Sequence, residues 1–452
     1  DENAPEMQYM HERRKALGGY LPQRRVKSDE SFKVPALSTF KAVLEPTAEG
    51  REISTTQAFV RMLTTLLRDK ELGPRVVPIV PDEARTFGME GMFRQLGIYS
   101  HEGQKYNPVD REQVMYYRED TKGQILEEGI NEAGAFSSWI AAATSYSTNN
   151  RIMVPFYIYY SMFGFQRIGD LAWAAGDMQA RGFLLGGTAG RTTLNGEGLQ
   201  HEDGHSHILS ATIPNCVSYD PTFAHEVAVI IRHGMKRMIE DQENVYYYLT
   251  VMNENYPQPG LVEGQEDGII RGIYRLRESP GKGGKGRAQL LGSGTILREV
   301  MAAAELLEAD WGIDADVWSV TSFTELRRDG MDAERHNMLN PTASKPAVPY
   351  VTTALQDSKG PIVASTDYMK LFADQIRPYI PQGRQYRVLG TDGFGRSDFR
   401  SKLREHFEVD RHFVVLATLR ALADQGEVPV EKVAEAITRY KINIDKANPA
   451  YA

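Results

Sequence analysis

Residues 201–207 crowd five side chains that could bind a metal ion or transfer a proton into one short segment. They are His201, Glu202, Asp203, His205 and His207. His201 and His205 have the i, i+4 spacing that zinc sites use on a helix. Gly204 lies between them, and the glycine-rich stretch 186–198 before them cannot form a continuous helix, so this spacing loses its geometric meaning. Spacing alone therefore leaves three interpretations open: a metal site, a polar active-site loop, or a loop whose polar groups satisfy one another.

A second candidate for chemistry is Glu132, in the stretch QILEEGINEAG. Together with Glu127 and Glu128 it lies near the start of a predicted helix over 131–146, where the helix dipole favours carboxylates. An acidic helix cap is one interpretation. Only apolar or small residues follow Glu132, so we expect its side chain to point into the protein. A buried carboxyl group has a raised pKa and can exchange a proton near neutral pH.

The elements that must position these residues alternate between apolar strands and amphipathic helices. Strands are predicted over 75–80, 151–163 and 183–190, and helices over 54–73, 131–146 and 167–182. This alternation is typical of a parallel sheet covered on both faces, so the predicted fold class is α/β. Ligands of such sheets collect at the carboxyl ends of the strands. The polar residues to inspect are therefore Asp82 and Glu83, the stretch 160–163, and the loop 186–207.

A second α/β unit is predicted after a boundary rich in Pro, Gly and charge over 254–287. The sequence pattern therefore predicts a linker over 1–49 and one α/β unit on each side of this boundary. Two glycine-rich stretches in the second unit resemble ligand loops. LGSGTILREV has Leu297 where a dinucleotide fingerprint needs its third glycine, so a structural turn is favoured. GTDGFGRSD leaves a functional and a structural loop equally open.

Composition narrows the classes of partner and compartment. A net charge of −8 argues against nucleic acid and against anionic membranes as main partners. No apolar run approaches the roughly 20 residues that span a bilayer. The single cysteine, Cys216, excludes an intrachain disulfide and is typical of a reducing compartment, so a cytoplasmic location is predicted. Because the chain begins without Met, we expect it to be a piece of a longer protein.

Six stretches together resemble one known family. They are DEARTFGMEGMF, QILEEGINEAG, PFYIYYSMFGFQRIGD, GRTTLNGEGLQHEDGHSH, ASTDYMKLFADQIR and LGTDGFGRSD. These stretches closely resemble the homodimeric bacterial pyruvate dehydrogenase, the thiamine-diphosphate-dependent decarboxylating component of the pyruvate dehydrogenase complex. The resemblance runs from about residue 8 to the C-terminus. It implies a transketolase-like fold, with a pyrimidine-binding domain over 50–262 and a transketolase-like C-terminal domain over 268–452.

The resemblance also implies roles for individual side chains. Glu132 would hydrogen-bond the aminopyrimidine ring of thiamine diphosphate and exchange a proton with it, and Phe163 would stack on that ring. Polar residues lining the same cleft would position pyruvate and stabilise developing charge. They are Asp82, Glu83, Tyr160 and His201. Residues 102–118 correspond to a loop that can order over the active site.

One departure from the family is large. Its members carry an N-terminal diphosphate-binding domain whose Gly-Asp-Gly…Asn motif holds Mg²⁺, and this chain has no such segment. The chain would then supply only the pyrimidine half of a site shared across a homodimer and would be inactive alone. Its partners would be pyruvate and the dihydrolipoyl acetyltransferase core with its lipoyl domains. The alternatives are another enzyme of the transketolase superfamily and a non-catalytic dimerisation or docking fragment.

Overall fold

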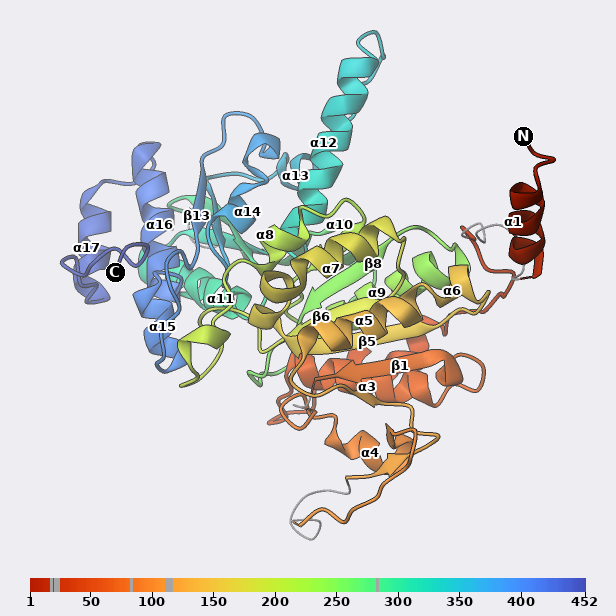
Figure 1. Cartoon of the computed structure of the whole chain (residues 1–452). Coiled ribbons are helices and arrows are strands. Elements are labelled where there is room, and N and C mark those ends of the chain that lie inside the picture. The colour runs from red at the N-terminus through yellow and green to blue at the C-terminus, as the bar shows by residue number, and fades with distance from the viewer. Residues whose placement is uncertain (17–18, 20–24, 82–83, 110–116, 282–283) are drawn as a thin grey trace.

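The structure is a computed structural model that describes residues 1–16, 19, 25–81, 84–109, 117–281 and 284–452. Two large sheets follow one another along this part of the chain, and each is covered by helices on both faces (Figure 1). The first sheet is parallel throughout and the second has one antiparallel edge strand. The predicted α/β class, with two successive domains and mainly parallel sheets, is confirmed.

The first sheet is built from strands that are mostly buried on both faces, while its edge strand β4 is partly buried. In spatial order these are β4 Leu126–Glu127, β1 Val76–Val80, β5 Val154–Tyr160, β6 Phe183–Gly187, β8 Tyr246–Thr250 and β7 Cys216–Tyr219. Successive side chains of a strand point to opposite faces. On β5, Phe156 and Ile158 therefore join one apolar cluster, while Tyr157 and Tyr159 join another.

Each of these two clusters is closed by helices. On the side of Phe156, the core contains residues from α3 Thr55–Leu67 and α9 Ala224–Met235. On the side of Tyr157, it contains residues from α5 Glu132–Ala143 and α7 Phe165–Asp177. The shorter elements of this domain are α4 Phe93–Leu96, β2 Ile98–Tyr99, β3 Glu119–Asp120, α6 Ser145–Thr148 and α8 Ser206–Ser210.

The second sheet has the spatial order β13 Tyr386–Leu389, β12 Ile362–Ser365, β10 Arg287–Gly292, β11 Asp314–Ser319 and β9 Tyr274–Arg277. One face packs against α11 Ile296–Leu306, α16 Arg411–Asp424 and α17 Glu431–Arg439. The other packs against α12 Phe323–Leu339, α13 Tyr350–Leu355 and α14 Leu371–Asp374. Among the described helices, none combines the length and the apolar character needed to cross a membrane.

Three segments differ from the sequence prediction. The predicted linker over 1–49 contains a helix of three turns, α1 Pro5–Ala16, and its later part packs on the first domain through helix α2 Lys41–Leu44, whose Val43 is buried. The predicted boundary over 254–287 contains α10 Glu266–Arg271 and strand β9. The pattern predicted no element over 323–339, because its apolar positions are few and widely spaced. Helix α12 forms there nevertheless and projects from the body (Figure 1).

The two domains meet along a seam of buried polar groups. The backbone N–H of Asp220 donates to the carbonyl oxygen of Thr321 at 2.8 Å. Glu226 accepts hydrogen bonds from the hydroxyl of Tyr274 at 2.7 Å and from that of Ser319 at 2.6 Å. Hydrogen bonds constrain orientation more strictly than apolar contacts do. The seam therefore sets the position of one domain relative to the other, and with it the loops that both domains contribute to the site.

Candidate active site

Three aromatic rings from two loops meet at the carboxyl ends of β5 and β6. The His201 ring stacks on Tyr160, with centroids 4.9 Å apart and an interplanar angle of 17°. Phe163 meets the His201 ring edge-on at 5.1 Å and 67°. Tyr160 ends β5, Phe163 lies in the 3₁₀ turn Ser161–Phe163 that follows, and His201 comes from the loop after β6. The structure thus brings together residues about 40 positions apart that the sequence placed in one cleft.

Glu132 joins this group through a residue that the sequence analysis did not single out. The Glu132 side chain is 12% exposed, and its Oε1 accepts a hydrogen bond from Nη1 of Arg167 at 3.0 Å. The guanidinium carbon of Arg167 lies 3.9 Å from the centroid of the Phe163 ring. Arg167 lies inside the stretch FGFQRIGD, which contributed to the family resemblance, but the residue itself was interpreted only as the start of a helix. The signal that could have identified Arg167 is an arginine that follows two aromatic residues within a few positions of the sequence.

Local chemistry explains why Glu132 and Phe163 lie where they do. The side-chain oxygen of Asn131 accepts from the backbone N–H of Gly134 at 3.0 Å, which makes Asn131 the N-cap and Glu132 the first residue of α5. After β5 the chain turns sharply at Gly164. A Cβ atom there would lie 2.2 Å from the Tyr159 ring, so only glycine allows the turn carrying Phe163 to pack this closely.

The segment that follows β1 also contacts this group. Its Thr86 hydroxyl oxygen lies 3.5 Å from the Tyr160 hydroxyl, and the Phe87 ring lies 5.5 Å from the Tyr160 ring. Asp82 and Glu83, which were predicted to line the cleft, lie outside the described residues. The segment that follows them in the chain nevertheless contacts the predicted site.

The loop that carries His201 is held in place by the second domain. Asp367, directly after β12, accepts from the backbone N–H and hydroxyl of Thr192 at 2.9 and 2.7 Å and from the hydroxyl of Thr193 at 2.6 Å. The buried guanidinium of Arg191 donates to the carbonyl oxygen of Gly393 at 2.6 Å. Gly393 belongs to GTDGFG, for which the sequence left two interpretations open; its contacts here are structural.

The three histidines of the crowded segment have separate environments. His201 pairs with Glu197 at 3.2 Å and faces the aromatic cluster. His205 lies 3.2 Å from the side-chain oxygen of Gln166. His207 is fully buried, and its two ring nitrogens bond the hydroxyls of Ser218 and Thr250 at 2.6 and 2.9 Å. Burial lowers the pKa of His207 to about 3, so the ring is neutral at pH 7. Of the three, only His201 contacts the rings of Tyr160 and Phe163.

Glu202, next to His201, is a buried carboxyl group without a hydrogen-bond partner among the described residues. Burial and the nearby charge of Asp367 raise the pKa of Glu202 to about 9, although Arg191 opposes this shift. The group is therefore protonated at pH 7. Within the described part of the chain, no cluster of three His, Cys, Asp or Glu side chains could hold a metal ion.

Solved structures with a similar fold include transketolases. The chain superposes on the transketolase from Leishmania mexicana with a TM-score of 0.62 at 14% identity, covering 87% of this chain and 48% of the other. It superposes on an inactive split-gene transketolase with a TM-score of 0.53 at 14% identity, covering 82% of this chain and 99% of the other. The fold, with polar and aromatic residues at the carboxyl ends of its first sheet, is therefore of the transketolase-like class.

The sequence comparisons are more specific than the fold. Residues 34–259 match the family "Pyruvate dehydrogenase E1 component middle domain", and residues 272–410 match "Transketolase-like TK C-terminal domain". The chain is 66% identical to the pyruvate dehydrogenase E1 component of Pseudomonas aeruginosa over 99% of its length and 62% identical to that of Escherichia coli K12 over 100%. It belongs to the pyruvate dehydrogenase E1 component family, and it spans 50% of the length of these two relatives.

Proposed function

We propose that this chain supplies the pyrimidine-binding half of a thiamine-diphosphate site in an enzyme that oxidatively decarboxylates pyruvate. The acetyl group would pass to a lipoyl group of dihydrolipoyl acetyltransferase. Membership of the pyruvate dehydrogenase E1 component family supports this proposal. The observation that carries it is the arrangement of Arg167 between Phe163 and Glu132.

The residues present fit an aminopyrimidine ring. Such a ring needs an aromatic face to stack on and a carboxylate to accept its N–H hydrogen bond. The flat, N–H-bearing guanidinium of Arg167 makes both contacts: it lies over Phe163 and donates to Glu132. A planar heterocycle with an N–H donor could make the same two contacts once Arg167 moves aside. Thiamine diphosphate, when bound, supplies the carbanion chemistry that amino-acid side chains lack.

Each side chain of the cleft then has a proposed role. The carboxylate of Glu132 would accept a proton from a ring nitrogen and return it, and Phe163 would fix the plane of the ring. Tyr160 and His201 place a hydroxyl and an imidazole beside that plane, where they would bind pyruvate and stabilise developing negative charge. For Asp82 and Glu83, which lie outside the described residues, the same role toward pyruvate follows from the family resemblance alone.

The same proposal covers the division into domains, the site of Mg²⁺ and the diphosphate, and the compartment. The division into a pyrimidine-binding domain over 50–262 and a C-terminal domain over 268–452 follows the two sheets. Mg²⁺ and the cofactor diphosphate would be held by the half of the relatives that this chain does not span, in a homodimer. The enzyme would act in the cytoplasm, in keeping with its free, buried Cys216 thiol.

The test is Glu132→Gln in a protein of the relatives' full length, assayed by ferricyanide-linked decarboxylation of pyruvate. The expected loss in kcat is at least about 100-fold, the range typical of a general acid–base group. Glu128→Gln is the matched control, because Glu128 lies four positions before Glu132 and accepts a hydrogen bond from the Ser138 hydroxyl. Its change should leave kcat within about twofold of the parent. Equal activity of the two variants would contradict the proton-exchange role.

Two further measurements address the alternatives. Ketol transfer between sugar phosphates that exceeds pyruvate decarboxylation would favour another transketolase-superfamily activity. The 452-residue chain alone is expected to show no turnover and little affinity for thiamine diphosphate, because it provides the pyrimidine half of the site. Calorimetry that finds micromolar affinity for the chain alone would contradict the half-site proposal. If the full-length protein does not decarboxylate pyruvate at all, the remaining alternative is a non-catalytic dimerisation or docking fragment.

A further inference from the structure

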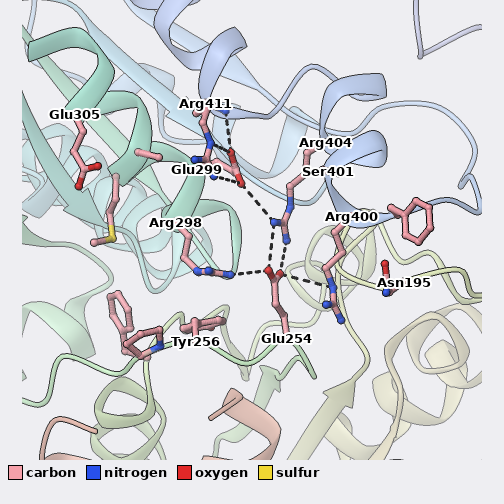
Figure 2. Close-up of a pocket in the computed structure, with 15 residues that line it drawn as sticks. Asn195, Glu254, Tyr256, Arg298, Glu299, Glu305, Arg400, Ser401, Arg404 and Arg411 are labelled. Atoms are coloured by element: carbon pink, nitrogen blue, oxygen red, sulfur yellow. Dashed lines mark hydrogen bonds and ion pairs between the residues drawn. The ribbon is translucent and has the colours of Figure 1, made fainter. Parts of the chain in front are cut away.

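A second cleft lies at the seam between the domains, on the side of α11 and α15 Arg400–His406. Its volume is about 670 Å³, within the roughly 300–1,000 Å³ range of small-molecule sites. Arginine side chains from three segments converge on it, together with carboxylates from both domains (Figure 2). The arginines are Arg298, Arg400, Arg404 and Arg411.

Two carboxylates organise the arginines before any ligand binds. Glu254 accepts from Arg298 at 2.6 Å and from Arg404 at 2.5 Å. Glu299 accepts from two nitrogens of Arg411 at 2.9 and 3.1 Å. Burial would raise the pKa values of both carboxyl groups, but the arginines outweigh it and hold them below the ordinary value. Both groups are therefore ionised at neutral pH, and with Glu305 the lining carries four guanidinium groups against three carboxylates.

Arg400 keeps donors that this network does not use. Its Nε donates to the carbonyl oxygen of Thr193 at 2.5 Å and lies 3.9 Å from Glu254. Within the described residues, its two terminal nitrogens make no hydrogen bond. Arg298 uses one terminal nitrogen for Glu254, and its guanidinium carbon lies 4.6 Å from the centroid of the Tyr256 ring. Figure 2 shows Arg298 and Arg400 on opposite sides of Glu254.

We propose that this cleft binds a small molecule that bears a phosphate or polyphosphate group, held by the unused N–H donors of Arg400 and Arg298. The guanidinium fork matches phosphate oxygens bidentately, and a partly enclosed cleft strengthens such charge-assisted bonds. Glu254 keeps both arginines aligned, which reduces the ordering that binding requires.

The same geometry connects this cleft to the candidate active site. Arg400 donates to the backbone of Thr193, and Thr193 lies in the loop that ends at His201. The Thr193 hydroxyl also donates to Asp367. A phosphate bound by Arg400 therefore stabilises α15 against this loop. The site is independent of the proposed catalytic function, and it would exist whichever reaction the enzyme performs.

The test is calorimetric titration of the full chain with pyrophosphate in a phosphate-free buffer of low ionic strength. Saturable binding is expected, weakened at least about tenfold by Arg400→Gln or Arg298→Gln and abolished by the double change. Arg420→Gln is the matched control, because Arg420 lies on α16, pairs with Asp424 and does not line the cleft. Glu132→Gln should also bind pyrophosphate normally, which separates this proposal from the proposed function.

The side chains of Arg400 and Arg298 are 30% and 35% exposed. Because both are partly exposed, their replacement should leave the chain folded. Thermal unfolding of each variant verifies this, and Arg400→Lys, which keeps the charge but loses the fork, should bind with intermediate affinity. No saturable binding to the parent chain would overturn the proposal. Equal affinity of the parent and the double variant would also overturn it.

Discussion

The guanidinium of Arg167 covers the Phe163 ring at 3.9 Å and at the same time donates to Glu132. One side chain therefore occupies the aromatic face and the carboxylate that the proposed cofactor ring would use. Because a cation over an aromatic ring and a partly exposed ion pair contribute only about 0.5–1 kcal/mol each, a ligand with better stacking can displace Arg167.

Arg167→Gln should tighten binding of thiamine diphosphate to a protein of the relatives' full length by about three- to tenfold. The reason is that the ligand no longer has to displace roughly 1 kcal/mol of competing contacts. Fluorescence titration measures the affinity. Arg151→Gln is the control, because Arg151 is exposed and pairs with Glu30, away from the cleft. Weaker binding in Arg167→Gln would mean that this arginine assists the cofactor instead of competing with it.

Gly164→Ala should destabilise the first domain and displace Phe163. Its Cβ would lie 2.2 Å from the Tyr159 ring, and Tyr159 is fully buried, so the turn must shift. The expected loss in unfolding free energy is about 1–3 kcal/mol, measured by urea denaturation. Gly169→Ala on α7 is the matched control: no atom lies within 4 Å of its added Cβ, and alanine favours helix by roughly 0.5–1 kcal/mol. Equal effects of the two changes would refute the packing argument.

Glu202→Gln should change how stability depends on pH. The pKa of Glu202 is about 9 in the folded chain and near its ordinary value of 4.5 in the unfolded chain. Between these values the folded state holds a proton that the unfolded state has lost, so stability falls as pH rises. The amide removes this contribution. Urea unfolding between pH 6 and 8 should show a shallower decline for the variant, and parallel curves would show that Glu202 is already ionised.

Glu254→Gln should weaken the contact between the domains. Arg404 is buried and would lose one of its two carboxylate partners, and breaking a buried ion pair costs about 3–5 kcal/mol. Burial raises the pKa of Glu254, but Arg404, Arg298 and Arg400 lower it further. Because the folded pKa lies below the unfolded one, this stabilisation is present above about pH 4.5 and is lost as pH falls through the folded value. Denaturation at pH 7 and pH 4 measures both effects.

Glu305→Gln is the control for Glu254→Gln. Glu305 lines the same cleft, and within the described residues it forms no ion pair. Its stability should differ from that of the parent by less than about 0.5 kcal/mol. If the two variants lose the same stability, the carboxylate of Glu254 does not hold the arginines as described.

Much of the fold was predictable because its signals are local. Apolar runs with period two or with both faces buried predicted the main strands, and a cap followed by apolar positions at helical spacing predicted α3. Helix α12 escaped prediction because only one side near its base packs against the domain, where Phe323, Leu326 and Ala333 are buried. Strand β9 escaped because its short apolar stretch becomes a strand only by pairing with β11.

For the candidate site, the sequence by itself determined which residue types lie at the strand ends: Tyr160 and Phe163 at the end of β5, and His201 in a glycine-rich loop after β6. The strand order then placed them at one edge of the sheet. Only the tertiary structure decided that Arg167 bridges Phe163 and Glu132, that Asp367 holds the His201 loop, and that arginines meet at the seam. These contacts join segments far apart in the chain, and hydrogen bonds between such segments depend on packing that local patterns do not encode.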